Sequence, residues 1–175
     1  SPGNSIGLIN VAGDISFGPG STLIIETDGI SGAADLVAAT GSATLSGGTL
    51  SLMMADPAAN WSTAYTVLTA DGGVTGSFDN VSSNAGSTFL ATGVDYGATA
   101  VTVQMTRNNV AFADYAVTVN ERAAANALDA LPQSSALYGA VVVQDGAGAT
   151  EAFEALSGDI HASLKTGLIE DSRYV

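Results

Sequence analysis

The sequence predicts a mainly β protein: a right-handed parallel β-helix of about three to four coils, followed by an α-helical C-terminal segment. Residues 1–106 contain short segments of alternating apolar and polar residues, separated by glycine, and they contain no Lys or Arg. From Asn120 onward the chain is rich in Ala and Leu at helical spacing. The chain therefore divides into 1–106, a β portion; 107–119, a transition; and 120–175, a helical segment.

A series of short strands is predicted in the β portion. Apolar residues alternate with Ser, Thr or Asp in each of them, as at Leu23 and Ile25 or at Val101 and Val103. This alternation places one face of each strand in a core and the other in water. The predicted strands are Gly7–Ala12, Asp14–Phe17, Thr22–Thr27, Asp35–Ala39, Ala43–Leu45, Thr49–Met53, Ala64–Thr69, Gly76–Phe78, Thr88–Ala91 and Ala100–Thr106.

Two all-β architectures accommodate such strands, an antiparallel sandwich and a parallel β-helix. The β-helix is favoured because hairpin dipeptides are few, and because the pairs Gly47-Gly48 and Gly72-Gly73 precede strands as solenoid corners do. Small corner residues also let successive coils stack at about 4.8 Å. The alternation lapses at Asp56–Tyr65, which holds the only Trp, Trp61. This segment is interpreted either as a lid over one end of the stack or as a surface loop.

The helical segment is predicted to contain several helices, each opened by a polar residue that can cap it. The last helix carries Ile160, Leu164 and Leu168 on one apolar stripe. The predicted helices are Asn120–Leu131, Ser134 or Ser135 to Val143, Thr150–Leu156 and a final one from Ser157 onward, with a turn at Gly146–Gly148 before the third.

Composition excludes several classes of function. The formal net charge of −13 repels phosphate backbones, so we expect no binding to nucleic acid. The same charge argues against attachment to anionic lipid head groups. Cysteine is absent, which excludes disulfides, thiolate metal sites and cysteine nucleophiles.

No catalytic, cofactor-binding or metal-ligating residue is predicted. His161 is the only histidine and is interpreted as a polar residue of the last helix, because it lies far in sequence from the Ser-rich strands of the β portion. The Asp71–Asp79 segment is similar to Gly/Asp calcium-binding repeats, but it occurs once and without the stacked repeat that such sites need.

The carboxylates of the β portion are candidate catalytic groups. An enzyme for anionic sugars needs Lys or Arg beside them, and this portion has neither. A hydrolase for neutral glycans needs only two carboxylates, for which Asp28 and Asp35 are the nearest pair. Aspartates beside glycine are more often turn residues, and that interpretation is favoured. The carboxylates considered are Asp14, Glu26, Asp28, Asp35, Asp71, Asp79 and Asp95.

Several phrases of the sequence, read together and in order, resemble the end of the passenger of a classical, monomeric bacterial autotransporter. The resemblance covers nearly the whole chain. The phrases are Ser1–Gly7, Gly20–Leu23, Ala43–Leu50, Tyr65–Ala70, Gly73–Phe78, Tyr96–Val103, Ala127–Pro132 and Leu156–Ser163.

This resemblance implies a secreted or cell-surface protein whose parent is anchored in the outer membrane of a Gram-negative bacterium. The β portion would correspond to the family's autochaperone region, and Ile160–Glu170 to the linker in the pore of a C-terminal β-barrel translocator. The partners implied are that barrel, which would follow this chain, and passenger coils upstream. The chain is thus expected to be a piece of a longer protein.

The function expected is a non-enzymatic folding and secretion module that nucleates β-helix folding at the cell surface during translocation. The alternative is an adhesive module whose Ser- and Thr-rich faces bind a host or bacterial surface. Open coil edges would also allow self-association, since unpaired strand edges are a hazard.

Overall fold

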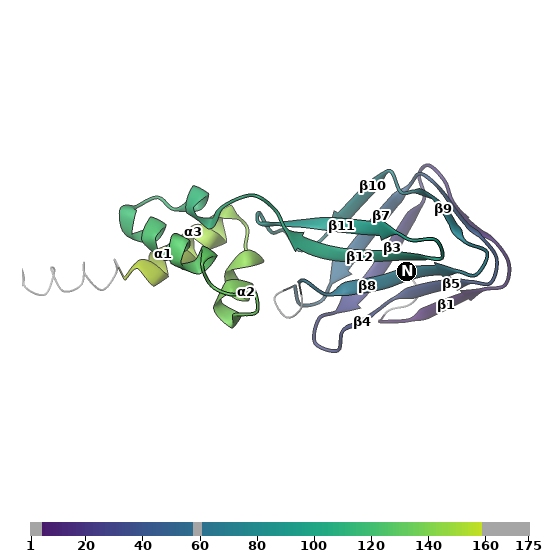
Figure 1. The fold of residues 1–175 in the computed structure, drawn as a ribbon, viewed down its shortest axis with the longest axis horizontal. Helices are drawn as coiled ribbons and strands as arrows, with labels where there is room; N and C mark the ends of the chain where they lie inside the picture. The colour runs from purple at the N-terminus through teal and green to yellow at the C-terminus, as the bar shows by residue number, and fades with distance from the viewer. Residues whose placement is uncertain (1–4, 58–60, 159–175) are drawn as a thin grey trace, which may run out of the picture. The chain divides into compact units, whose positions relative to one another are not determined.

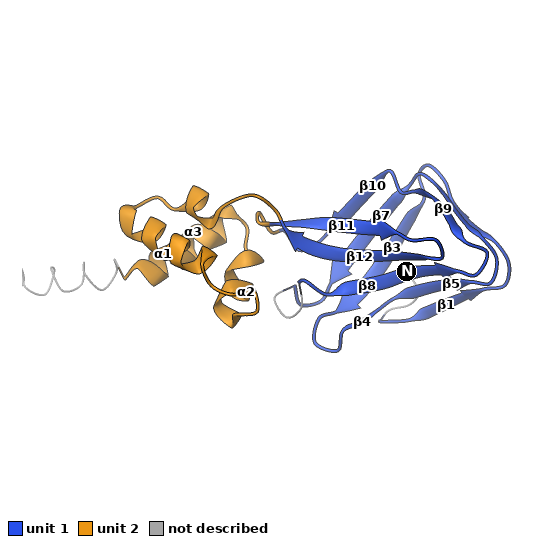
Figure 2. Cartoon of the chain, in the orientation of Figure 1, with its two compact units in different colours: residues 1–86, 90–107 blue, residues 87–89, 108–175 orange. Residues whose placement is uncertain are grey.

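The computed structural model describes residues 5–57 and 61–158. The chain divides into two compact units, which Figure 2 colours separately. The β unit comprises residues 1–86 and 90–107, and the helical unit comprises residues 87–89 and 108–175. Three residues that lie in the sequence between strands of the β unit, Ser87–Phe89, therefore belong to the helical unit.

The β unit contains three sheets, and Figure 1 labels their strands except β2 and β6. The strand orders are β1-β5-β8-β12-β11, β10-β7-β3-β4 and β2-β6-β9. The strands are β1 (Leu8–Val11), β2 (Ile15–Phe17), β3 (Thr22–Asp28), β4 (Ala33–Ala34), β5 (Leu36–Ala39), β6 (Ala43–Ser46), β7 (Thr49–Met54), β8 (Ala64–Ala70), β9 (Val74–Ser77), β10 (Asn80–Ser83), β11 (Leu90–Tyr96) and β12 (Ala100–Arg107).

The core of the β unit is built from like residues stacked on one another across strands. Leu23 of β3 pairs with Leu50 of β7, and Ile25 pairs with Leu52 two residues further along. All four are at most 5% exposed. The alternation seen in the sequence therefore places the apolar residues inside, and hydrophobic burial is the main contribution to the stability of the unit.

The prediction of a single right-handed parallel β-helix is wrong. The sheets are mixed, and the described residues do not form one continuous parallel solenoid. Strand β12 runs antiparallel to both β8 and β11, and β3 runs antiparallel to β4. The six other strand pairs among the described residues are parallel. For β11 and β12 the physical reason is a tight turn at Gly97–Thr99. This turn folds the two strands into a hairpin, in which the Gly97 N–H donates to the Ala100 carbonyl (2.9 Å).

Two strands were not predicted, and one was placed too early. Strand β10 is polar, Asn-Val-Ser-Ser, and β4 has only two residues, so neither shows the alternation used to find strands. The strand predicted at Thr88–Ala91 begins instead at Leu90. Phe89 is completely buried but belongs to the helical unit, which alternation along a strand cannot indicate.

Glycine at one corner of the β unit is required by close approach of the backbone. The Gly41 N–H donates to the Gly13 carbonyl, and the Gly72 N–H donates to the Gly41 carbonyl, both at 2.9 Å. A Cβ atom on Gly41 would lie 2.6 Å from the carbonyl carbon of Gly13, and one on Gly72 would lie 2.8 Å from that of Gly41. Larger residues at these two positions would push successive turns of the chain apart.

The helical unit contains the 3₁₀ helix η1 (Phe112–Tyr115) and the α-helices α1 (Val119–Asp129), α2 (Ala136–Val142) and α3 (Gly146–Ser157). Helix α1 is capped by Thr118, whose side chain accepts from the Glu121 N–H. The Glu121 carboxylate in turn accepts from the backbone N–H groups of Thr118 (3.2 Å) and Val117 (2.7 Å). This reciprocal arrangement satisfies the free donors at the start of the helix.

The core of the helical unit is aromatic. Phe112 lies at its centre, with ring centroids 4.8 Å from Phe89, 5.3 Å from Tyr138 and 6.1 Å from Phe153. The rings are tilted or edge-on to one another, as aromatic pairs prefer. Because Phe89 comes from between β10 and β11, this core is assembled from two separate stretches of sequence.

The helices differ from their predicted bounds in two places. The predicted turn Gly146–Gly148 is the first turn of α3, which Asp145 caps by accepting from the Gly148 N–H (2.8 Å). A Cβ atom at position 146 would contact the Tyr115 ring, so a larger residue there would make that ring shift. Ser157, predicted to open a helix, is the last residue of α3. The rest of that predicted helix, with His161, lies outside the described residues.

Candidate functional site

One end of the β unit presents strand edges that no described strand pairs with. Strand β1 is the edge strand of its sheet. The Gly7 carbonyl accepts from the Leu36 N–H of β5, and the Val11 carbonyl accepts from the N–H of Thr40, which follows β5. Because alternate residues of a parallel strand face opposite neighbours, Leu8 and Asn10 direct their backbone groups away from β5. The outer edge of β1 therefore offers the amides and carbonyls of Leu8 and Asn10 to an incoming strand.

The other two sheets also have strands with an unpaired outer edge on this side of the β unit. Strand β2 is an edge strand, and β3 is paired on its outer side only at Thr27 and Asp28, by the two-residue strand β4. Leu8 is 55% exposed and Ile9 is 39% exposed. We refer to the outer edges of β1, β2 and β3 as the open edge. It combines unpaired backbone groups with exposed apolar side chains, a combination that favours strand addition.

The opposite side of the β1-β5-β8 ladder is closed by the antiparallel hairpin of β11 and β12. Residues Ala100–Gln104 of β12 pair with β8, with a bulge between Val101 and Thr102. The turn of the hairpin accepts two further hydrogen bonds, from the Ala70 N–H at Thr99 (2.9 Å) and from the Val74 N–H at Ala98 (2.8 Å). This ladder thus ends in the hairpin on one side and in β1 on the other, while β9, β10 and β11 are also terminal strands of their sheets.

Polar side chains join successive turns of the β unit. Asp35 is completely buried and accepts from the backbone N–H groups of Gly7 (2.7 Å) and Glu26 (2.9 Å). Asp14 accepts from the Ser42 N–H, and Asp79 from the Gly48 N–H. The Gly7, Ser42 and Gly48 bonds join residues 28 to 31 positions apart. Asp14, Asp35 and Asp79 are not regularly spaced in the sequence, so no repeat of aspartates indicates these bonds.

The predicted carboxylate pair, Asp28 and Asp35, divides into two structural roles. Asp28 is the predicted turn residue: its carboxylate accepts from Ser31 Oγ (2.7 Å) and from the Ile30 N–H (2.9 Å). These hydrogen bonds, that of Ser31 first, lower the pKa of Asp28 below its usual value. Asp35 is not a turn residue, because both of its oxygens are engaged by backbone from other parts of the unit. The described structure therefore shows no free pair of carboxylates here.

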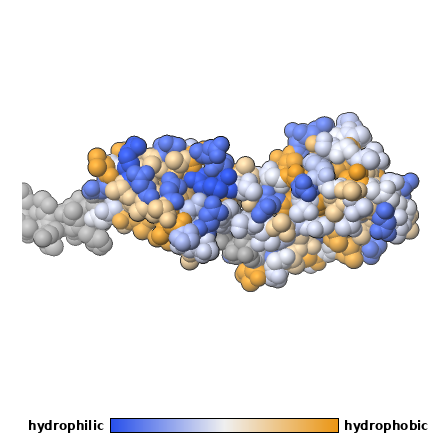
Figure 3. Space-filling model, viewed as in Figure 1, coloured by the Kyte–Doolittle hydropathy of each residue, from blue (hydrophilic) through white to orange (hydrophobic). Residues whose placement is uncertain are grey.

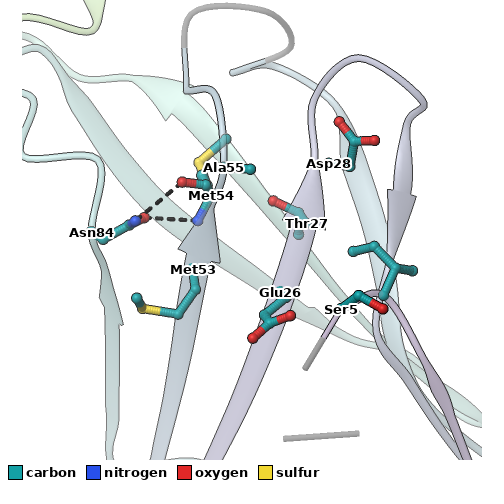
Figure 4. A pocket seen from close by; sticks show the side chains of 9 residues that line it. Ser5, Glu26, Thr27, Asp28, Met53, Met54, Ala55 and Asn84 are labelled. Carbon is teal, nitrogen blue, oxygen red and sulfur yellow. Dashed lines mark hydrogen bonds between the residues drawn. The ribbon is translucent and has the colours of Figure 1, made fainter. Parts of the chain in front are cut away.

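A pocket of about 380 Å³ lies beside the ends of β3 and β7, and Figure 4 shows the residues that line it. Glu26 and Asp28 contribute carboxylates, and Met53 and Met54 contribute thioethers. The amide of Asn84 is bound to the backbone of Met54 through both its oxygen (2.7 Å) and its nitrogen (3.1 Å). The described lining offers no histidine, lysine or arginine for acid–base chemistry.

Two buried hydroxyl groups, Thr27 Oγ1 and Tyr65 Oη, have no hydrogen-bond partner among the described residues. Tyr65 lies in β8 and is 3% exposed, and Trp61 just before it is 5% exposed. Burial raises the pKa of Tyr65 above its usual value. Because its hydroxyl lies away from water, this tyrosine is neutral at physiological pH and contributes packing rather than chemistry.

The remaining carboxylates named in the sequence analysis do not form one cluster. Asp71 and Asp95 are exposed and take part in none of the turn-to-turn hydrogen bonds described above. The described part of the chain has no group of three or more His, Asp or Glu side chains that could hold a metal ion. The prediction that the chain has no catalytic or cofactor-binding residue stays a prediction. Within the described ranges, no helix is long and apolar enough to cross a membrane.

Comparison with known proteins relates the chain to an extracellular protein. No protein-family model matches it. The chain is similar to the extracellular serine protease of Serratia marcescens, with 27% identity over 226 residues. The alignment covers the whole chain and 21% of that protein, so the chain spans a small part of the length of this relative. The chain is thus similar to one region of an extracellular protein.

Proposed function

We propose that the chain is a non-enzymatic folding module of an autotransporter passenger, displayed at the cell surface or secreted. In this role the open edge receives strands from the residues that precede the chain in its parent protein. Three observations support the proposal: the ordered phrases that resemble those of autotransporter passengers, the similarity to an extracellular protein, and the unpaired outer edge of β1.

The observation that carries the proposal is the unpaired outer edge of β1. Here the hairpin β11–β12 covers β8, while Leu8 and Asn10 of β1 remain available. Each added strand would gain backbone hydrogen bonds and apolar contacts from its neighbour alone, so folding can propagate from this unit toward the N-terminus.

This role fits export, because it needs no energy source at the cell surface. The resemblance implies that the C-terminal part of the passenger emerges first. A unit that folds on emergence and then stabilises each following strand would bias movement of the chain outward. Without cysteine, the described unit also reaches its fold with no oxidation step.

The proposal is tested by blocking the open edge without disturbing the fold. The Asn10 N–H faces away from β5, so Asn10→Pro removes a donor from the open edge and leaves the β1–β5 hydrogen bonds in place. Asn10→Ala is the matched control, because it keeps the N–H. In the full-length parent we expect Asn10→Pro to reduce display of a protease-resistant passenger, and Asn10→Ala to retain it.

Two measurements make the test decisive. Urea unfolding of the 175-residue chain should show that both variants keep the stability of the parent chain. Deletion of residues 49–106, which removes the hairpin and most of the core, should abolish protease-resistant display. Normal display of a resistant passenger by the Asn10→Pro variant would exclude strand addition at this edge.

A further inference from the structure

Three residues from between two strands of the β unit complete the helical unit. Ser87–Phe89 lie between β10 and β11 in the sequence, yet they belong to the helical unit, as in Figure 2. The Ser87 hydroxyl donates to the Val142 carbonyl (2.6 Å), and the Thr88 N–H donates to the Gln144 carbonyl (3.1 Å). Carbonyls at the end of a helix have no partner within it, so this segment satisfies the carbonyl of the last residue of α2.

The helical unit depends on this segment because its other helices bury their apolar residues incompletely. Leu137 and Leu156 are each 44% exposed, and apolar (orange) residues appear on the visible surface of the helical unit in Figure 3. Helix α2 has only seven residues, and so short a helix is marginal in water without tertiary contacts. Phe89 is completely buried and packs on the rings of Phe112 (4.8 Å between centroids) and Tyr115 (5.6 Å). This ring is therefore a structural part of the unit.

The hairpin of β11 and β12 begins and ends at this segment. Phe89 directly precedes β11, and Asn108 directly follows β12. The Asn108 N–H donates to the Phe89 carbonyl (2.9 Å), and the Asn108 side-chain amide donates to the Thr88 carbonyl (2.9 Å). Leu90 and Arg107, the first pair of the hairpin, come next along the chain. The two ends of the hairpin are thus fixed side by side by contacts within the helical unit.

Fixing the ends of a chain segment lowers the entropic cost of folding it. When Phe89 and Asn108 are held together, residues 90–107 form a loop whose ends already meet. A covalent link around a loop of this length shifts the folding equilibrium by a factor on the order of 100. The hydrogen bonds and the ring contacts of Phe89 therefore have a large effect available to them.

We propose that the helical unit stabilises the β11–β12 hairpin, and through it the β unit, by fixing the two ends of the hairpin next to each other. The effect extends beyond the hairpin because β12 pairs with β8. The stability of the β unit thus depends on residues that follow it in the chain. This dependence does not rest on the role proposed for the open edge, because it involves none of the residues of that edge.

The attachment of the segment is tested by Ser87→Ala, with Ser82→Ala as the matched control. The Ser87 hydroxyl donates to Val142 and accepts from the Phe89 N–H (3.0 Å), whereas Ser82 is exposed on β10. We expect Ser87→Ala to accelerate hydrogen exchange of the Asn108 amide about tenfold, and Ser82→Ala to leave it unchanged. Equal exchange in the two variants would show that the ends of the hairpin are not held through α2.

The dependence itself is tested on the 175-residue chain by Phe153→Ala, with Glu154→Ala as the control. Phe153 is completely buried in α3 of the helical unit, and Glu154 is exposed on the same helix. Phe153→Ala should accelerate tryptic cleavage after Arg122, within α1, because it opens the helical unit. It should also lower the urea midpoint reported by Trp61 fluorescence, in the β unit, by about 1 M. Glu154→Ala should change neither.

A disulfide at the base of the hairpin separates this mechanism from any other coupling. Leu90→Cys with Arg107→Cys places two cysteines opposite each other on neighbouring antiparallel strands, in a chain that has no other cysteine. In the reduced form, Phe153→Ala should lower the Trp61 midpoint by about 1 M, as before. In the oxidised form the disulfide fixes the ends, so the same substitution should lower the midpoint by less than about 0.3 M.

Two outcomes would overturn the proposal. One is an unchanged Trp61 midpoint in the reduced Phe153→Ala chain while cleavage after Arg122 is faster, which would make the two units independent. The other is an equal shift in the oxidised and reduced forms, which would mean that the β unit is not stabilised through the ends of the hairpin.

Discussion

Asp35→Ala tests most sharply how the turns of the β unit are held together. The Asp35 side chain is completely buried, and its two oxygens accept from Gly7 and Glu26 at 2.7 and 2.9 Å. A hydrogen bond to a charged acceptor contributes about 1.5–3 kcal/mol. Because Gly7 and Glu26 are half-buried, water can replace part of what is lost. We therefore expect the free energy of unfolding to fall by about 3 kcal/mol, the lower end for two such bonds.

The assay is urea unfolding followed by the fluorescence of Trp61. This residue is the only Trp, is 5% exposed, and belongs to the β unit, so its signal reports on that unit alone. With an m value of about 2 kcal/mol/M, the midpoint should fall by about 1.5 M. Asp14→Ala, which removes one exposed bond to Ser42, should cost about 1 kcal/mol.

Asp71→Ala is the control for loss of charge, because the Asp71 side chain is exposed and makes none of these bonds. It should change the free energy of unfolding by less than about 0.5 kcal/mol. Equal effects of Asp35→Ala and Asp71→Ala would refute the reasoning, since the loss would then follow net charge rather than hydrogen bonding.

Three further predictions follow from the described contacts. Burial raises the pKa of Tyr65 above 10.0, so its contribution to stability is complete below that pH and is lost as pH rises through the raised pKa; Tyr65→Phe should abolish this loss in alkaline urea titrations, without a cost at neutral pH. Ser31→Ala should raise the pKa of Asp28 toward its usual value in an NMR titration, because the Ser31 hydroxyl is its main stabilising donor. Phe89→Ala should destabilise the helical unit by about 3–5 kcal/mol and accelerate tryptic cleavage after Arg122.

The sequence predicts where the strands lie better than whether neighbouring strands pair parallel or antiparallel. Alternation at Leu23 and Ile25 reports which face is buried, and the structure confirms it. Alternation is the same for parallel and antiparallel neighbours, so the turn at Gly97–Thr99 was indistinguishable from a corner. The polar strand β10 was missed because its position follows from pairing with β7, not from its own residues.

The remaining differences between prediction and structure come from contacts between residues that are distant in the sequence. Phe89 lies three residues after Gly86 of the β unit, yet its ring packs on Phe112 of the helical unit, and no local pattern indicates such a contact. Asp35 resembled a turn residue because it follows small residues, but its partner Gly7 lies 28 positions away. The glycines of α3 predict a turn, although Gly146 begins the helix and packs against the Tyr115 ring.

Hydrogen exchange at the open edge tests the central claim most directly. Amide exchange would be compared between the 175-residue chain and a longer chain that carries the preceding residues of the parent protein. The account predicts that the amides of Leu8 and Asn10, which face away from β5, gain protection in the longer chain, while that of Ile9 is protected in both. Equally rapid exchange of Leu8 and Asn10 in both chains would contradict it.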